Sequence, residues 1–313
     1  MLNYNNNEYA AVEGNDERIW WSWNQEGYRP HPESHRTLQA PTLVVLGGRV
    51  TMYITGVDYQ IYYSFLEDAA SNNWTPWMRI PGDAYTDQSP AVTTIQEEAY
   101  IAVNRLDRHL GMQRMTVSPR PAPVPDAVSF NAHWGREPNG VMRPAGNWTS
   151  QSPGIFGQMT STAAGCAVGN FVGYGISSLI TGRDDHLYGA TVCAEDWGAP
   201  LDWNRLEDGE CLTQPDVARG GSLDRVDPSN QAAESRLLVA CEGMDGNVWT
   251  NYTTNRGASW GGWSSTTDGA GPSTRRPAVN NQGGNFDLRI TWNGEANHRF
   301  PDHSVIEKTI NFS

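Results

Sequence analysis

Aromatic residues recur in this chain four positions after an acidic residue, and rings at regular positions can build a repeated binding site. The rings are Trp20, Tyr62, Tyr188 and Trp249, after Asp16, Asp58, Asp184 and Asp245. Further candidates near them are Trp77, Trp263, Arg79, Arg183 and Asn251. Aromatic faces bind the apolar side of a pyranose, and guanidinium or amide groups hydrogen-bond to its hydroxyls. For any one ring, a structural wedge between sheets is the first interpretation, and only the recurrence of the rings favours carbohydrate binding by these residues.

Catalytic chemistry has less support in the sequence. Glycoside hydrolysis needs two carboxyl groups at a defined separation. The chain has many Asp and Glu residues, and nothing in the sequence distinguishes one pair of them as catalytic. The repeated acids lie in turns, where an Asp side chain accepts backbone N–H groups. The seven histidines are scattered, and neither HExxH nor CxxC occurs. We therefore expect no catalytic residue, no metal and no cofactor.

The elements that position the candidate residues form an internal repeat. One anchor is Thr-x-Gln-x-Pro, which begins at Thr37, Thr86 and Thr149 and survives in shorter form at Thr213. The second is a strand, a turn with an acidic residue, and another strand that opens with an apolar residue. Alternating apolar residues on both sides of such a turn predict a half-buried antiparallel hairpin. A period of about 40 to 50 residues is typical of propeller blades.

The repeat predicts an all-β fold, a β-propeller of about six four-stranded blades, with five and seven as the alternatives. The chain is a single domain, 1–313, with approximate units 3–40, 41–89, 90–152, 153–214, 215–276 and 277–313. Because the first and last units are short, we expect the N- and C-terminal strands to pair and close the ring, which removes exposed edges.

The composition and net charge of the chain limit the classes of partner that it can bind. The net charge is −13, and Lys and Arg number only 22, so nucleic acid and anionic membrane surfaces are disfavoured. No apolar run is long enough for a membrane-spanning helix, and the N-terminus has no signal-peptide pattern. An extracellular or secreted protein is favoured, with a homo-oligomer left open. The four cysteines, Cys166, Cys193, Cys211 and Cys241, fit two disulfides or four free thiols.

The repeat resembles those of bacterial and fungal propeller lectins, most nearly the Photorhabdus-type fucose-binding lectins. The residues that carry this resemblance are the Ser89-Pro90-Ala-Val start, the strand 100–103 with Asp107, the segment Gly56-x-Asp58-x-x-Ile61-Tyr62, and Trp74-Thr-Pro-Trp77. Separately, residues 253–260 look like the Asp-box turn of sialidase propellers, with Asn255 in place of Asp. Unit three departs from the pattern because Gly111 stands where an aromatic is expected.

The resemblance implies a non-catalytic, multivalent lectin for glycans, fucose among them, with shallow sites between blades. The alternatives are a propeller glycosidase with one central site and a protein-interaction platform. The sequence does not fix the sugar or the number of working sites.

Overall fold

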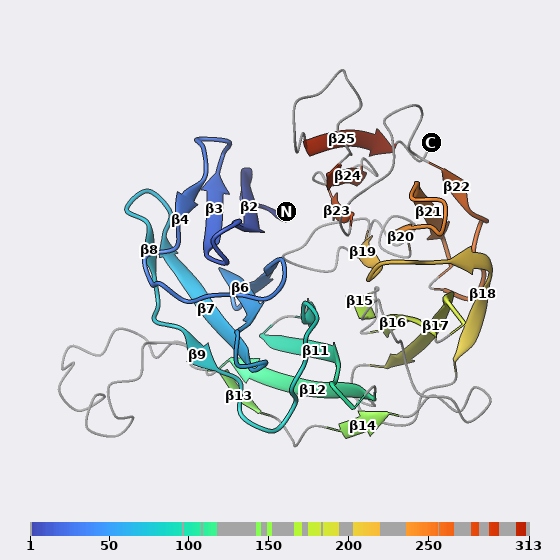
Figure 1. The fold of residues 1–313 in the computed structure, drawn as a ribbon, viewed down its shortest axis with the longest axis horizontal. Coiled ribbons are helices and arrows are strands. Elements are labelled where there is room, and N and C mark those ends of the chain that lie inside the picture. The colour runs from blue at the N-terminus through green and yellow to red at the C-terminus, as the bar shows by residue number, and fades with distance from the viewer. Residues whose placement is uncertain are drawn as a thin grey trace.

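The strands of this protein form six antiparallel sheets around a central axis (Figure 1). The computed structural model describes residues 2–95, 97–107, 109–117, 142–144, 149–151, 166–170, 175–182, 184–193, 203–219, 236–255, 257–265, 277–281, 288–293 and 305–310. We number the sheets as blades 1 to 6 in chain order. The predicted all-β propeller is confirmed.

Each blade is a meander whose strands pair in sequence order. Blade 1 contains β1 (Leu2–Tyr4), β2 (Asn7–Glu13), β3 (Ile19–Trp23) and β4 (Arg29–Pro30). Blade 2 contains β5 (Thr42–Leu46), β6 (Arg49–Thr55), β7 (Ile61–Asp68), β8 (Asn73–Trp74) and β9 (Met78–Arg79). Blade 3 contains β10 (Ala91–Ile95), β11 (Glu98–Asn104), β12 (Leu110–Val117), β13 (Met142–Pro144) and β14 (Thr149–Gln151).

The remaining blades follow the same plan. Blade 4 contains β15 (Cys166–Asn170), β16 (Gly175–Thr181), β17 (His186–Cys193) and β18 (Asn204–Glu210). Blade 5 contains β19 (Asp216–Arg219), β20 (Leu237–Glu242), β21 (Val248–Thr253) and β22 (Ser264–Ser265). Blade 6 has three described strands, β23 (Ala278–Asn281), β24 (Leu288–Asn293) and β25 (Val305–Ile310). In blades 2 and 3 the outer strand is in two pieces, because β8 and β9 both pair with β7, and β13 and β14 both pair with β12.

The hydrophobic core lies between neighbouring blades. Along β6, Met52 and Ile54 belong to a cluster shared by blades 1 and 2, whereas Tyr53 belongs to one shared by blades 2 and 3. Side chains of a strand alternate between its two faces, so a strand with apolar residues on both faces is buried from both sides. Similar clusters join blades 3 and 4 and blades 4 and 5. The core is therefore a series of blade interfaces, which we name by the two blades they join.

The ring closes differently from our expectation. In the described residues β1 pairs with β2, and β25 pairs with β24, so the terminal strands stay in their own sheets. Asn5 and Asn6 have φ of 50° and 59°, which suits the tight turn of a two-residue hairpin. That turn lets Leu2, which is buried, begin the inner strand of blade 1. The ring closes because β1 lies beside β23, as first strands of adjacent blades do elsewhere.

The connection from one blade to the next is tied to the second strand of the following blade. Between blades 1 and 2, the Thr37 hydroxyl lies 3.1 Å from the Thr55 carbonyl oxygen, to which it donates. Between blades 4 and 5, Cys211 holds the corresponding position and forms a disulfide with Cys241 of β20. The backbone matches at both points, since the next residue, Leu38 or Leu212, donates its N–H to the end of that strand. A disulfide thus replaces a hydrogen bond, and the alternative of four free thiols is excluded.

Blade 5 contains the turn that resembles an Asp box. The Asn255 side chain accepts from the Thr253 hydroxyl (2.9 Å) and from the Ser259 N–H (2.9 Å). The Thr253 hydroxyl oxygen also accepts the Gly257 N–H at 2.9 Å. The side-chain amide of Asn255 therefore closes this turn.

Candidate functional site

The acidic turn between the second and third strands has the same geometry in five blades. In blade 2 the Gly56 N–H donates to the Gln60 carbonyl (2.8 Å), and Asp58 Oδ1 accepts the Gln60 N–H (3.1 Å). The other four acids accept the N–H two residues further on in the same way: Asp16, Asp107, Asp184 and Asp245. These carboxylates hold the turns together, as such Asp side chains commonly do.

The aromatic residue four positions later completes this turn. The Tyr62 hydroxyl donates to Asp58 Oδ2 at 2.7 Å, and the Tyr188 hydroxyl donates to Asp184 Oδ2 at 2.7 Å. Burial and this hydrogen bond to a carboxylate raise the pKa of each tyrosine to about 12. Trp249 uses its indole N–H for the same purpose, 3.0 Å from Asp245 Oδ1. The polar end of each ring is therefore engaged by the turn, and only the ring itself remains for a ligand.

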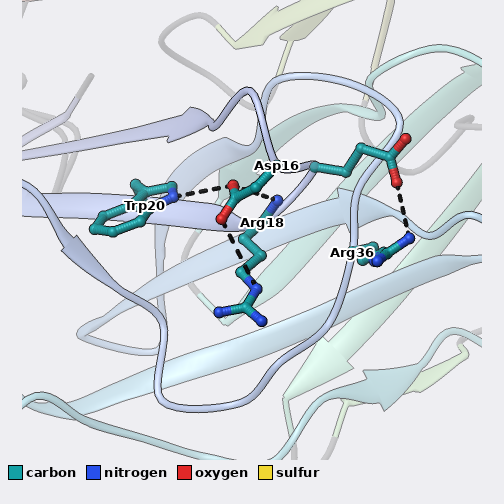
Figure 2. A network of polar contacts seen from close by, with 5 residues as sticks. Asp16, Arg18, Trp20 and Arg36 are labelled. Atoms are coloured by element: carbon teal, nitrogen blue, oxygen red, sulfur yellow. Dashed lines mark hydrogen bonds and ion pairs between the residues drawn. The ribbon is translucent and has the colours of Figure 1, made fainter.

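Blade 1 shows the arrangement with a tryptophan (Figure 2). The Trp20 indole N–H lies 3.3 Å from Asp16 Oδ1, and the Arg18 guanidinium lies 3.8 Å from the same carboxylate. Beside this turn, Arg36 is 3.3 Å from Glu17. These side chains are largely exposed, so the ion pairs contribute little stability.

A glycine lies beneath each of these rings. A Cβ built on Gly56 would be 2.9 Å from Tyr62 Cε2, and one on Gly182 would be 2.7 Å from Tyr188 Cε2. The corresponding distances for Gly14 and Gly243 to the Cδ1 atoms of Trp20 and Trp249 are both 2.6 Å. Real Cβ contacts are not this short, so the first residue of the turn must be glycine wherever the ring is present.

The outer strand brings a second aromatic residue and a cation beside the ring in two blades. Tyr62 is opposite Arg79 in blade 2, and Tyr188 is opposite Arg205 in blade 4. A tryptophan precedes each arginine by two residues: Trp77 and Trp203. Blades 2 and 4 therefore carry one set, Tyr, Trp and Arg, in one register. Our sequence analysis did not select Trp203 or Arg205, although the spacing of residues 188, 203 and 205 repeats that of 62, 77 and 79.

Both sets face the preceding blade. Tyr62 and Trp77 pack against the cluster of the 1–2 interface, and Tyr188 and Trp203 pack at the 3–4 interface. Trp263 of blade 5 packs at the 4–5 interface, and its ring lies close to Gly209 of β18. The Nε1 atoms of Trp77, Trp203 and Trp263 are buried and have no acceptor among the described residues. The partly exposed surfaces of these indoles are therefore their ring carbons.

Two histidines extend the 1–2 interface. The His31 ring is 5% exposed and lies between Trp74 and Trp77, with ring centroids 5.2 and 4.6 Å away. Burial lowers the pKa of His31 to about 4, so the ring is neutral near pH 7. Its Nδ1 accepts the Glu33 N–H at 3.2 Å. The His35 ring lies 4.5 Å from the Tyr62 ring and joins that ring to Trp77.

The structure thus brings together three of the residues expected to bind a ligand: Tyr62, Trp77 and Arg79. Tyr188 is only 6% exposed, so at the 3–4 interface Trp203 and Arg205 offer more surface to a ligand than this ring does. Asn251 is 2% exposed, and its Oδ1 accepts the N–H groups of Tyr252 (2.7 Å) and Gly262 (3.1 Å), so it stabilises the backbone. Trp20, Trp249 and Trp263 are partly buried. Arg183 lies outside the described residues.

No cluster of three or more His, Cys, Asp or Glu side chains in the described part of the chain is arranged to hold a metal ion. The described residues contain no helix that is long and apolar enough to cross a bilayer.

Known proteins resemble this chain in structure. No protein-family model matches the sequence, and no curated protein matches it. The BP39L lectin from Burkholderia pseudomallei superimposes with a TM-score of 0.59 at 13% identity, over 96% of this chain and 76% of that one. A variant of AofleA from Arthrobotrys oligospora gives 0.61 at 9% identity, over 98% and 87%.

A third solved structure, the fucose-specific lectin from Aleuria aurantia, gives a TM-score of 0.54 at 9% identity, over 97% of this chain and 86% of that one. At these identities the likeness shows the fold. The chain is therefore structurally similar, over nearly its whole length, to β-propeller lectins that include a fucose-specific one.

Proposed function

We propose that this protein is a non-catalytic, multivalent lectin whose principal glycan sites lie at the 1–2 and 3–4 interfaces. The observation that carries the proposal is the set of Tyr, Trp and Arg that blades 2 and 4 hold in the same register. Such recurrence is expected of a copied binding site, because a wedge between sheets does not need an arginine beside it.

The chemistry of the set suits a sugar. Arg79 and Arg205 are both exposed, and a guanidinium offers five N–H donors to hydroxyl oxygens. Trp77 and Trp203 are half-buried, so part of each indole can cover the apolar C–H face of a pyranose. The donor and the ring lie two residues apart on one outer strand, which places a polar and an apolar contact side by side.

The remaining blades carry incomplete sets, so we expect weaker sites there. In blade 5 the ring of Trp249 is opposite Ser265, and in blade 1 Trp20 is opposite Pro30. Neither partner supplies a cation. The two complete interfaces still suffice for avidity toward a surface that displays many copies of one sugar.

Terminal L-fucose is the sugar we propose first. The support is the structural likeness to a lectin described as fucose-specific, together with the resemblance of the repeat to fucose-binding lectins. A glycan array with free-sugar competition tests this choice. Saturable binding to fucosylated glycans supports it, and binding confined to another terminal sugar would replace fucose while leaving the lectin in place.

Removal of one arginine is expected to remove one site. Calorimetric titration of the protein with methyl α-L-fucoside should give two strong sites per chain, one for each complete set. Arg79→Ala and Arg205→Ala should each leave one, and the double variant should lose at least tenfold in affinity, because a hydrogen bond from a charged donor contributes about 1.5–3 kcal/mol.

Arg49→Ala is the matched control, because Arg49 belongs to the same blade but packs over the Phe65 ring, 3.9 Å from its centroid. It should retain both sites. Unchanged stoichiometry in the folded Arg79→Ala, Arg205→Ala variant would contradict these sites. If the native protein bound no glycan on the array, that result would instead contradict the lectin function.

A further inference from the structure

Blade 3 departs from the other blades at two positions that face each other. The backbone bond that starts the acidic turn is present, since the Arg105 N–H donates to the His109 carbonyl at 2.9 Å. Arg105 therefore occupies the position of Gly56. Gly111, four residues after Asp107, occupies the position of Tyr62. The glycine and the bulky residue have exchanged places.

The Arg105 side chain fills the space that a ring fills elsewhere. A Cβ built on Gly111 would lie 3.0 Å from Arg105 Cδ and 3.1 Å from its Cγ, so the aliphatic part of the arginine covers this glycine. Its guanidinium is 3.3 Å from Asp107 Oδ2. In blade 2 the corresponding oxygen of Asp58 accepts the Tyr62 hydroxyl. Arg105 thus performs both structural roles of the ring, covering a glycine and binding the turn acid.

Each arrangement excludes the other. Where the ring is present, the first turn residue has no room for a Cβ. Where Arg105 is present, a Cβ at residue 111 would lie 3.0–3.2 Å from side-chain atoms of Arg105 and Val103, so these side chains would have to move. A change at one of the two positions therefore requires a change at the other, and the turn itself keeps its geometry in both cases.

We propose that Arg105 and Gly111 are a compensating pair that keeps the fold of blade 3 while removing the tyrosine of a sugar site, so that the 2–3 interface does not bind glycan. The inference rests on the proposed function for its binding part only. The Arg105 guanidinium is already paired with Asp107. It therefore does not replace the hydrogen-bond donors that Arg79 and Arg205 supply on the outer strand. At that outer position blade 3 has Ser150, opposite Gly111.

A double-mutant cycle tests the compensation without any sugar. Arg105→Gly opens a void over Gly111, and Gly111→Tyr collides with Arg105, so each single variant should lower the melting temperature by about 4 °C or more. The combined variant should recover to within about 2 °C of the native protein, because the tyrosine then covers glycine and reaches Asp107. Additive losses in the combined variant would overturn the proposal.

The reverse exchange in blade 2 is the matched control. Gly56→Arg alone should be strongly destabilising, since Tyr62 leaves no room for a Cβ. Gly56→Arg together with Tyr62→Gly should regain stability and should lose one sugar site. A combined variant that is no more stable than Gly56→Arg alone would overturn the proposal.

Binding is tested in a third variant, Arg105→Gly with Gly111→Tyr and Ser150→Arg, which gives blade 3 the residues of blades 2 and 4. Titration with methyl α-L-fucoside should find one site more than in the native protein. If the native protein binds the fucoside and this folded variant gains no site, Arg105 is not the residue that prevents glycan binding at the 2–3 interface. If neither the native protein nor any variant binds a glycan, the proposed function is wrong. The melting temperatures of the double-mutant cycle then still test whether Arg105 and Gly111 compensate for each other.

Discussion

Replacement of Cys211 and Cys241 together by alanine is expected to lower the free energy of unfolding by roughly 3 kcal/mol. The disulfide closes a loop of 30 residues that runs from the end of blade 4 to the second strand of blade 5. A cross-link over a loop of that length restricts the unfolded chain by an amount in this range. Both cysteines are buried in the 4–5 cluster, so their loss also removes some packing. Denaturant unfolding of the native and double-alanine proteins measures the difference.

Thr37→Val is the matched control, because Thr37 stands at the corresponding connection between blades 1 and 2. Its hydroxyl shares one hydrogen between the carbonyl oxygens of Gln39 (2.7 Å) and Thr55 (3.1 Å), so its loss should cost about 1–2 kcal/mol. The disulfide variant should lose clearly more than this. Equal losses, or free thiols in the native protein under oxidising conditions, would contradict the role assigned to the disulfide.

Two buried ionisable groups should give the stability opposite dependences on pH. The pKa of His31 falls to about 4 through burial, from an ordinary value of 6.5. Between these values the unfolded chain binds a proton that the folded chain does not, so His31 destabilises the fold as the pH falls from 6.5 to 4. The full effect is no more than about 3 kcal/mol.

Glu242 acts in the other direction. It is 7% exposed, and burial raises its pKa to about 7, from an ordinary value of 4.5. Between pH 4.5 and 7 the folded chain holds a proton that the unfolded chain has released. The stability due to this group is therefore complete below pH 4.5 and is lost as the pH rises to 7 and above, again by no more than about 3 kcal/mol.

Single variants should separate the two effects. In His31→Phe only the Glu242 contribution remains, so the free energy of unfolding should be higher at pH 4.5 than at pH 7. In Glu242→Gln only the His31 contribution remains, and the difference should have the opposite sign. In the native protein the two should largely cancel. The decisive quantity is the change between the two pH values, since either substitution also alters packing. Parallel pH profiles in the two variants would show that these groups do not set the dependence.

Much of the fold was predictable because its local signals repeat. The turn acids, such as Asp58, and the prolines that begin each unit predicted the hairpins and the ring of blades. The pairing of terminal strands was not predicted correctly, because the three residues of β1 are too few to show a periodic pattern. The Cys211–Cys241 bond depends on the register between two blades, which no local pattern reveals.

The candidate site was predictable in part. The equal spacing of the Tyr62, Trp77 and Arg79 set and the residues at 188, 203 and 205 was present in the sequence, but its meaning depends on which outer-strand residue lies opposite the ring. The burial of Tyr188 and Asn251 depends on the neighbouring blade and the adjoining turn. The exchange of Arg105 and Gly111 appeared in the sequence as a missing aromatic only, because its compensation lies in a contact between side chain and backbone.

The closure of the ring has a consequence for how its blades can be ordered along a chain. Because β1 and β25 both stay in their own sheets, every described sheet is made from one continuous stretch of sequence. A circular permutant opened at the exposed residues 32–34, between the buried His31 and Thr37 of the connection from β4 to β5, with the two ends of this chain joined by a linker, would therefore divide no sheet. Exposed connections of this kind tolerate new termini best, and each blade would keep the same two neighbours. The order of units along the gene can rotate while the ring of blades remains the same.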